Sequence, residues 1–467
     1  MIETFFGARL RALATIASVA IASPASAQQV PVARPDSVVQ PGAAIPLSLG
    51  DAARLAARQS AIAQGARLRV DEAQARVRQR RADLLPNVST YLQQSGRTFN
   101  TATFGISFPA PPGQPPVFDP AGEVEGPVNL VDVRGRVQQN LIDFGAVGRV
   151  RQAQAQARSS NAEADAIAEQ AATVASNAYI GSLRADAELR ARQADTVLAA
   201  ELLKIAESQL AAGTGVGLDV TRARAQVAAT RARLIAARNA RDHAQLDLLR
   251  ALALPVGTEI TLTDSLTPPA PATEALPDEA TLVAQALKNR PDLVAEEERI
   301  RAAKQGVSAI KAERFPSLGL VADNGAIGKT GGKLLNTYTW GLQVSLPIFD
   351  GFKREARMQE QQSVVKEAEV RRRDLEQQTQ VDVRGALIDL SGAREQLAAA
   401  IERLRLAEQE LAQARDRFNA GVAGNADVVN ASLALTASRT LVNDAETTWQ
   451  LARVSLARSI GSVTTLR

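Results

Sequence analysis

An internal duplication constrains this chain more than any other feature of its sequence. Each half begins with a helical segment that stops at a proline, Pro86 or Pro316, after which the chain is expected to become extended. A region of strand character follows, and it ends in related strings, LIDFG at 141–145 and PIFDG at 347–351. The sequence therefore predicts two similar halves, each with the order helix, strand, strand, helix.

The second part of each half consists of two helices joined by a short tip. The tips lie at 213–219 and 421–427, and a linker rich in proline joins the halves. The predicted division of the 467 residues is a signal peptide (1–27), an N-terminal extension (28–48), a first repeat (49–254, strands about 87–141), the linker (255–277), a second repeat (278–460, strands about 317–347) and a C-terminal tail (461–467).

The long helix of each half is longer than a compact domain needs. No proline interrupts 149–212 or 352–420. At ~1.5 Å per residue, each stretch would form a helix about 100 Å long. The shorter helices of each half, placed end to end, match this length, so we expect the wall of a rod or a tube.

The last helix of each half carries large apolar residues at a spacing of seven, with small residues between them. This pattern predicts left-handed coiled-coil packing, in which small side chains let the backbones approach closely. The heptads do not distinguish a closed helical barrel from a soluble antiparallel coiled coil. The seven-residue positions are Val220, Val227, Leu234, Arg241 and Leu248 in the first half, and Val428, Leu435, Val442, Trp449 and Leu456 in the second.

Two segments alternate between apolar and polar residues, as transmembrane barrel strands do. In 336–346, Tyr338 and Trp340 begin an apolar row, and threonine, glycine, glutamine and serine occupy the positions between. In 128–141, valines and a leucine alternate with charged and amide side chains. Barrel strands of about 10 residues direct apolar side chains to lipid and polar ones to the lumen.

Two weaker strand candidates, 88–94 and 317–323, bring the number to four, which cannot close a barrel with a lumen. Unpaired backbone groups at a strand edge cost several kcal/mol each in lipid. A ring of identical chains removes the edges, and three chains would supply about 12 strands. The predicted fold class is an α+β membrane protein with a trimeric 12-stranded β-barrel continuous with a long periplasmic α-helical barrel.

Aromatic residues gather in the strand regions. Tyr91, Tyr338 and Trp340 are expected at the interface between barrel and membrane, where aromatic rings suit the headgroup level. Residues that interrupt regular structure are expected at the junctions between strands and helices: Pro86, Gly145, Pro316, Pro347 and Gly351.

The first 27 residues have the form of a secretory signal, with Arg9 and Arg11 before an apolar stretch and Ala25-Ser26-Ala27 at its end.

Composition excludes several functions. There is no cysteine and one histidine, His243, so we expect no metal site, no cofactor and no Cys/His nucleophile. A net charge of +4 scattered along helices does not indicate a nucleic-acid partner. No catalytic motif is present, and we expect no enzyme.

These features resemble the TolC-like outer-membrane efflux proteins over nearly all of the chain after the signal. The resemblance rests on the duplicated order, on LPIFDG at 346–351, and on the tip strings AGTGVGLDV at 212–220 and AGVAGNADVV at 420–429. It implies a homotrimer in the cell outer membrane, in contact with lipid. It also implies a helical barrel that crosses the periplasm and docks on a periplasmic adaptor, which is linked to an inner-membrane pump or exporter.

The same resemblance assigns roles at the tips. The adaptor-docking tips would be Gly213, Thr214, Gly215, Val216, Gly217 and Leu218 in the first half, and Gly421, Val422, Ala423 and Gly424 in the second. Asp427, with Asn430 and Asp219, would form the constriction of the periplasmic gate. The family often has an acidic residue at the Asn430 position and can have a basic residue, which forms a closing salt bridge, at the Ala423 position. This chain has neither, so the gate is expected to be held by weaker ionic interactions than in those family members. Alternatively, both aspartates only stabilise the first turn of a helix.

Three functions remain open. The chain is a passive exit duct for substrates of an efflux pump, the outer-membrane component of type I protein secretion, or a periplasmic coiled-coil scaffold without a pore. The loop at 96–127, rich in proline and glycine, would narrow the outer mouth or bind a surface partner. The sequence does not indicate the substrate.

Overall fold

The computed structural model describes residues 45–104, 113, 122–267, 278–420, 422 and 424–466. The predicted signal peptide, most of the N-terminal extension, and parts of the 96–127 loop and of the linker lie outside the described residues. Gly421 and Ala423 lie outside them as well.

The chain divides into two units. In the smaller unit, the described residues are Ile45 and 258–260, and the Ile45 N–H donates to the Glu259 carbonyl at 2.9 Å. The larger unit comprises 46–257 and the rest of the chain from Thr261. Two short strands, β1 (Ile45–Leu47) and β4 (Ile260–Leu262), run from the smaller unit into the larger one, and all other elements belong to the larger unit.

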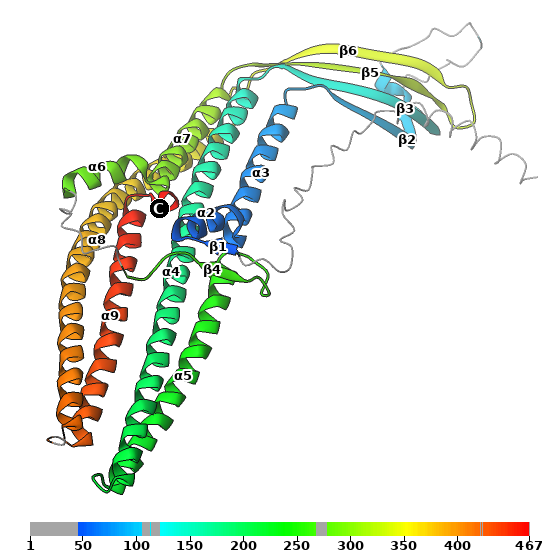
Figure 1. Cartoon of the computed structure of the whole chain (residues 1–467). Coiled ribbons are helices and arrows are strands. Elements are labelled where there is room, and N and C mark those ends of the chain that lie inside the picture. Colours follow the sequence, from blue (N-terminus) through cyan, green and yellow to red (C-terminus); the bar gives the residue numbers. More distant parts are fainter. Residues whose placement is uncertain are drawn as a thin grey trace, which may run out of the picture. The chain divides into compact units, whose positions relative to one another are not determined.

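The duplicated order of elements is confirmed (Figure 1). The first half contains α2 (Leu49–Gln59), α3 (Ala61–Ala82), β2 (Asn87–Asn100), the 3-10 turn η1 (Thr101–Phe104), β3 (Val124–Ile142), α4 (Phe144–Ala211) and α5 (Gly217–Ala251). The second half contains α6 (Glu279–Asn289), α7 (Pro291–Ala312), β5 (Ser317–Lys329), β6 (Leu335–Ser345), α8 (Lys353–Asn419) and α9 (Asn425–Ser459), with the 3-10 turn η2 (Val463–Thr465) after it.

The first helical segment of each half is broken, where the sequence predicted a continuous helix. Ser60 ends α2 with an extended backbone (ψ 150°), and its side chain accepts from the Ala63 N–H to begin α3. Arg290 has ψ 122° between α6 and α7 because a residue before proline disfavours the helical region, and Pro291 then occupies the first turn. After each break the chain continues in a new helix, and the short helices α2 and α6 contact the long helices α4 and α8, respectively.

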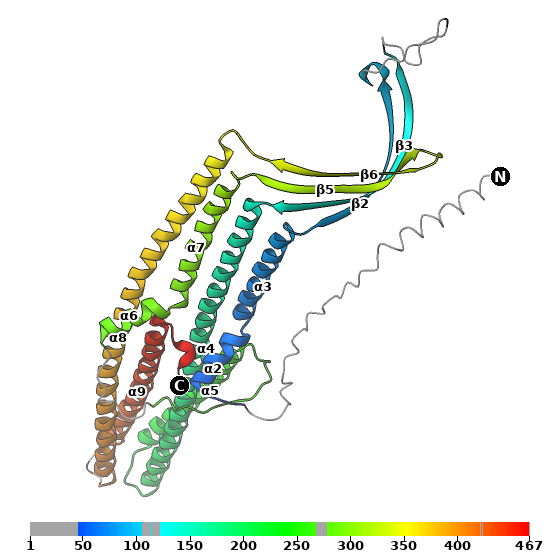
Figure 2. The same ribbon diagram turned by 90° about the horizontal axis from the view of Figure 1, so that it is seen from above.

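One antiparallel sheet joins the halves, with the strand order β2-β3-β5-β6. The central pair, β3 with β5, contains one strand from each half, and Val137 faces Ala322 across it. Figure 2 shows the four strands continuing from the ends of α3, α4, α7 and α8. The weaker strand candidates of the sequence are therefore full strands of the sheet.

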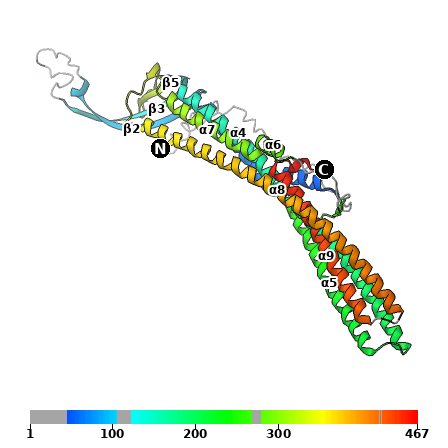
Figure 3. The same cartoon turned by 90° about the vertical axis from the view of Figure 1, so that its left-hand side faces the viewer.

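Below the sheet, the long helices pair with the shorter ones. α4 contacts α3, α7 and α5, whereas α8 contacts α7 and α9, and Figures 1 and 3 show the hairpins α4–α5 and α8–α9 side by side. The predicted seam is buried, as Val428 and Leu435 on α9 show with at most 3% exposure. They pack against Leu411 and Phe418 of α8. Each such side chain contributes about 1.5–3 kcal/mol of hydrophobic stabilisation.

A buried tyrosine ties the start of the larger unit to its middle. The Tyr179 hydroxyl on α4 lies 2.8 Å from the Leu47 carbonyl and 3.0 Å from the Asp264 carboxylate. It also accepts from the Asp264 N–H at 3.3 Å. Burial raises the pKa of Tyr179 because the phenolate would lose its water. The hydroxyl thus joins segments that precede α2 and follow α5.

Candidate functional site at the hairpin tips

The tip between α4 and α5 is closed by backbone hydrogen bonds. Gly213 follows the end of α4 with φ +73°, a left-handed conformation that glycine adopts without steric cost. The N–H groups of Thr214 and Gly215 then donate to the Gln209 carbonyl, each at 3.0 Å. Val216 is extended and precedes the first residue of α5. This turn is a helix-ending motif built on a left-handed glycine.

The tip between α8 and α9 has the same design where it is described. The Val422 N–H donates to the Arg417 carbonyl at 3.0 Å, five residues back, as Thr214 does to Gln209. Gly424 is extended (ψ 160°) and precedes α9. The roles predicted for Gly421 and Ala423 fall on residues outside the described part and stay predictions.

Asp219 and Asp427 lie at equivalent places in the first turns of α5 and α9. The residues that cap the two helices are Val216 and Gly424, so neither aspartate is itself the cap. Negative charge in the first turn is favourable because it faces the positive end of the helix dipole. The position of both aspartates agrees with the alternative that they stabilise the first turn of a helix through its dipole. It is also compatible with a gate role.

The two aspartates differ in their neighbours. Asp219 is partly buried and lies 3.9 Å from the guanidinium of Arg222, three residues later. The residue three positions after Asp427 is the neutral Asn430, and both are exposed. The duplication therefore has a cation at the first tip that the second tip lacks at this position. The gate role predicted for Asp427 stays a prediction.

Exposed apolar side chains lie at both tips. Val216 and Leu218 are 60% and 57% exposed, and Val422 is 69% exposed. Thr214 and Gly217 are exposed beside them, and Gly215 is partly buried. The docking role predicted for these tip residues stays a prediction.

A polar cluster joins α4 to α9 above the tips, and sequence reasoning missed it. Arg192 donates to Glu188 and Asp195 on its own helix at 2.8 and 2.9 Å, and to Thr440 of α9 at 2.8 Å. Arg439 of α9 donates to Asp195 at 3.3 Å. No local pattern could have revealed these contacts, because the partners are about 250 residues apart in the chain.

The strand register separates a polar from an apolar face of the sheet. On the polar face, Arg134 donates to Asp323 at 2.6 Å and to Thr337 at 3.1 Å. On the apolar face, Tyr338 and Trp340 are 74% and 69% exposed. Leu92 pairs with Val133 on this face as well, whereas its neighbour Tyr91 pairs with Arg134.

Tyr91 therefore lies on the opposite face from Tyr338 and Trp340. Its ring lies 5.5 Å from the guanidinium of Arg136, within the range of a cation–π contact. Because side chains alternate between faces along a strand, the three aromatics do not share one face, and the membrane-interface role predicted for them stays a prediction.

Four of the five predicted junction residues lie between strands and helices. Pro86 and Pro316 immediately precede β2 and β5, and Gly145 lies in the first turn of α4. Pro347 and Gly351 lie in the segment between β6 and α8, where Gly351 has φ +69°. Proline and left-handed glycine end regular structure, as Pro86, Pro316 and Gly351 do here.

Among the described residues, no group of three or more histidine, cysteine, aspartate or glutamate side chains could hold a metal ion. No helix within these ranges has the length and apolar character needed to span a membrane.

Comparison with known proteins gives a family match over most of the chain. Residues 52–254 and 282–462 match the family described as outer membrane efflux protein. The alkaline protease secretion protein AprF of Pseudomonas aeruginosa is 26% identical over 310 residues, which are 64% of this chain and 63% of AprF. The solvent efflux pump outer membrane protein SrpC of Pseudomonas putida is 33% identical over 165 residues, 34% of each chain. The matched parts thus span between a third and two thirds of these relatives.

Solved structures have the same fold. The CmeC outer membrane channel of Campylobacter jejuni superposes with a TM-score of 0.69 at 16% identity, covering 89% of this chain and 85% of CmeC. At this identity the likeness concerns the fold alone. This match confirms the predicted fold class, in which a duplicated unit combines strands with long helices.

Proposed function

This chain belongs to the outer membrane efflux protein family, and on that premise we propose that it is the passive exit duct of a tripartite efflux system. Its location is the cell outer membrane. The duct would receive substrates from an inner-membrane pump through a periplasmic adaptor. The observation that carries the proposal is a sheet with one exposed apolar face, continuous with helices that extend to paired tips.

Three copies would close the sheet into a barrel. β2 and β6 are the outer strands of the four-stranded sheet in the described chain, so each has one unpaired edge. In lipid such edges are prohibitive, and pairing β6 of one copy with β2 of the next removes them. The apolar face with Trp340 would contact lipid, and the Arg134 face would line the lumen.

The tips would form the periplasmic mouth. Asp427, with Asn430 next to it and Asp219 on the neighbouring hairpin, would set the charge of the constriction. Val216, Leu218 and the other tip residues would contact the adaptor. Opening would require an adaptor that binds the open arrangement more tightly than the closed one.

Photo-crosslinking in cells tests the docking role. A crosslinker at Val422, which is 69% exposed at a tip, is expected to capture a periplasmic adaptor. The matched control is Val256, which is 75% exposed near the end of α5 and far from the tips in the fold. Equal capture from both positions, or none from Val422 in a properly assembled protein, would contradict the docking role.

Protein secretion is the second candidate, because the match to AprF covers more of this chain than the match to SrpC does. Identification of the partner distinguishes the two candidates. An adaptor that serves a proton-driven pump supports efflux, whereas the adaptor of an ATP-driven exporter supports secretion. A protein released without detergent would favour the scaffold that the sequence left open.

A further inference from the structure

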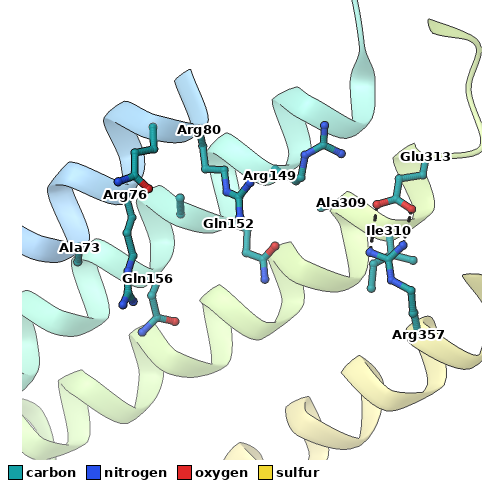
Figure 4. A pocket seen from close by; sticks show the side chains of 12 residues that line it. Ala73, Arg76, Arg80, Arg149, Gln152, Gln156, Ala309, Ile310, Glu313 and Arg357 are labelled. Carbon is teal, nitrogen blue, oxygen red and sulfur yellow. Dashed lines mark hydrogen bonds and ion pairs between the residues drawn. The ribbon is translucent and has the colours of Figure 1, made fainter. Parts of the chain in front are cut away.

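A hollow lies on one side of the helical wall just below the sheet (Figure 4). Its volume is about 490 Å³, and four neighbouring helices, α3, α4, α7 and α8, contribute to its lining. Four arginines line it, and the lining has a single acidic residue, Glu313, which follows the end of α7. The arginines are Arg76 and Arg80 of α3, Arg149 of α4 and Arg357 of α8. The remaining lining side chains are alanine, isoleucine and glutamine. Arginines therefore outnumber acids four to one in the lining, although Glu72, Asp83 and Asp143 lie beside three of these arginines outside it.

Two of the four arginines already form close ion pairs with glutamates. Arg357 donates to both carboxylate oxygens of Glu313, at 2.8 and 3.2 Å. Arg76 donates to Glu72 at 2.5 Å. A bidentate or short contact of this kind largely neutralises the charge locally.

The positive charges of Arg80 and Arg149 are less fully balanced by neighbouring carboxylates. Arg80 lies 3.7 Å from Asp83, beyond hydrogen-bond distance, and both side chains are about half exposed. Arg149 lies 3.4 Å from Asp143, whose other carboxylate oxygen already accepts from the Ala146 N–H at 2.8 Å. The guanidinium groups of these two residues keep free N–H donors for another anion.

Residues from four neighbouring helices line the same hollow, which is the arrangement expected on the concave side of a curved wall. A ring built from copies of this wall has its concave side inside. Given the proposed duct, the four arginines of each chain would face the passage below the barrel.

We propose that this arginine belt makes the upper passage select for solutes with an anionic oxygen group, such as a carboxylate or a phosphate. The inference rests on the proposed duct and names a class of cargo for it. A charged surface in a passage with low-dielectric walls concentrates ions of opposite sign. Guanidinium groups bind carboxylate and phosphate oxygens with two parallel hydrogen bonds. The glutamines beside them, Gln152 and Gln156, add neutral donors and acceptors.

The chain offers a matched control on the same helices. Two residues along a helix correspond to a rotation of about 200°, so Arg78 and Arg151 point away from the side of Arg80 and Arg149. Both are exposed, and neither lines the hollow. Exchanging either pair for glutamine removes the same charge from the same two helices.

The experiment is the reversal potential of the full-length protein in planar bilayers under a potassium chloride gradient. All variants carry Asp427→Ala, so that the acid proposed at the mouth does not set the selectivity. Relative to this parent, Arg80→Gln with Arg149→Gln is expected to lower the chloride-to-potassium permeability ratio by about two-fold or more. Arg78→Gln with Arg151→Gln should leave the ratio unchanged, and Arg80→Lys with Arg149→Lys should largely preserve it.

The outcomes separate this inference from the duct itself. A conducting protein whose ratio is unchanged by Arg80→Gln with Arg149→Gln, or falls equally in the control pair, overturns the arginine belt and leaves the duct standing. A protein without conductance overturns both.

Discussion

The carboxylate of Asp195 in α4 accepts a hydrogen bond from the guanidinium of Arg439 in α9 at 3.3 Å, although 244 positions separate the two residues in the chain. Asp195 is 4% exposed, and Arg192 approaches its other oxygen at 2.9 Å. One buried carboxylate therefore holds two cations and connects the two hairpins.

Asp195→Ala should destabilise the contact between the hairpins by about 3 kcal/mol, because it leaves two guanidinium groups without their shared anion. Thermal unfolding in detergent would measure the loss. Asp444→Ala is the control, because Asp444 pairs with Arg184 across the same helices at 2.7 Å but both are about half exposed. Its effect should stay below about 1 kcal/mol. Equal effects would show that burial of Asp195 does not matter.

Tyr179→Phe should lower stability by about 1–2 kcal/mol, because it removes a buried hydroxyl that serves Leu47 and Asp264. Urea unfolding would measure the change. Tyr338→Phe alters the same group at a position that is 74% exposed and should have little effect. If Tyr179→Phe is also neutral, the hydroxyl does not hold the segment before α2.

Glu446→Gln should stabilise the protein at neutral pH. Burial raises the pKa of Glu446, so its ionised form is penalised in the folded state. The penalty appears as the pH rises above the ordinary glutamate value of 4.5 and is complete above the raised pKa. The advantage of the variant should therefore vanish below pH 4.5, as unfolding at several pH values would show.

Glu402→Gln should have the opposite effect on stability. The carboxylate of Glu402 accepts hydrogen bonds from Arg405, and this contact lowers the pKa of Glu402. The stabilisation is present above the ordinary value of 4.5 and disappears as the pH falls through the lowered pKa. This variant should be slightly less stable than the parent at neutral pH, and a gain in stability there would contradict the lowered pKa of Glu402.

Gly213→Ala should loosen the first tip at a cost of about 1 kcal/mol, because φ +73° forces a Cβ atom against the backbone. Hydrogen exchange of the Thr214 and Gly215 amides, both bonded to Gln209, should accelerate. Gly217→Ala lies four residues away in the first turn of α5 with open space around it, and should leave exchange unchanged. Unaltered exchange in Gly213→Ala would show that the tip does not depend on the glycine.

Leu342→Lys should impair membrane assembly by about 2–4 kcal/mol, because it places a charge on the apolar face of β6. Gln343→Lys puts the same charge on the opposite, polar face of the sheet and should be tolerated. Residue 343 pairs with Gly319, which pairs with Asn140 on that polar face. The fraction of protein in outer membranes would be compared. Equal loss in both variants would contradict the assignment of faces.

The helices and strands could be predicted from the sequence because they depend on local patterns. The heptads of α9, from Val428 onward, correspond to its buried side in the structure. Alternation from Tyr338 onward corresponds to the exposed apolar face of β6. Proline and glycine at Pro86, Pro316 and Gly213 mark boundaries that the structure also has. In each case the information lies within a few residues.

Other features depended on partners far away in the chain. The sequence itself determined the duplication, the element types and the tip motif, since periodicity and turn chemistry are local. Only the tertiary structure decided that β3 pairs with β5, that Tyr91 lies beside Arg136, and that Asp195 meets Arg439. It also decided that arginines of separate helices line one hollow. The physical reason is that a contact between distant segments depends on register and packing, which no local pattern of side chains specifies.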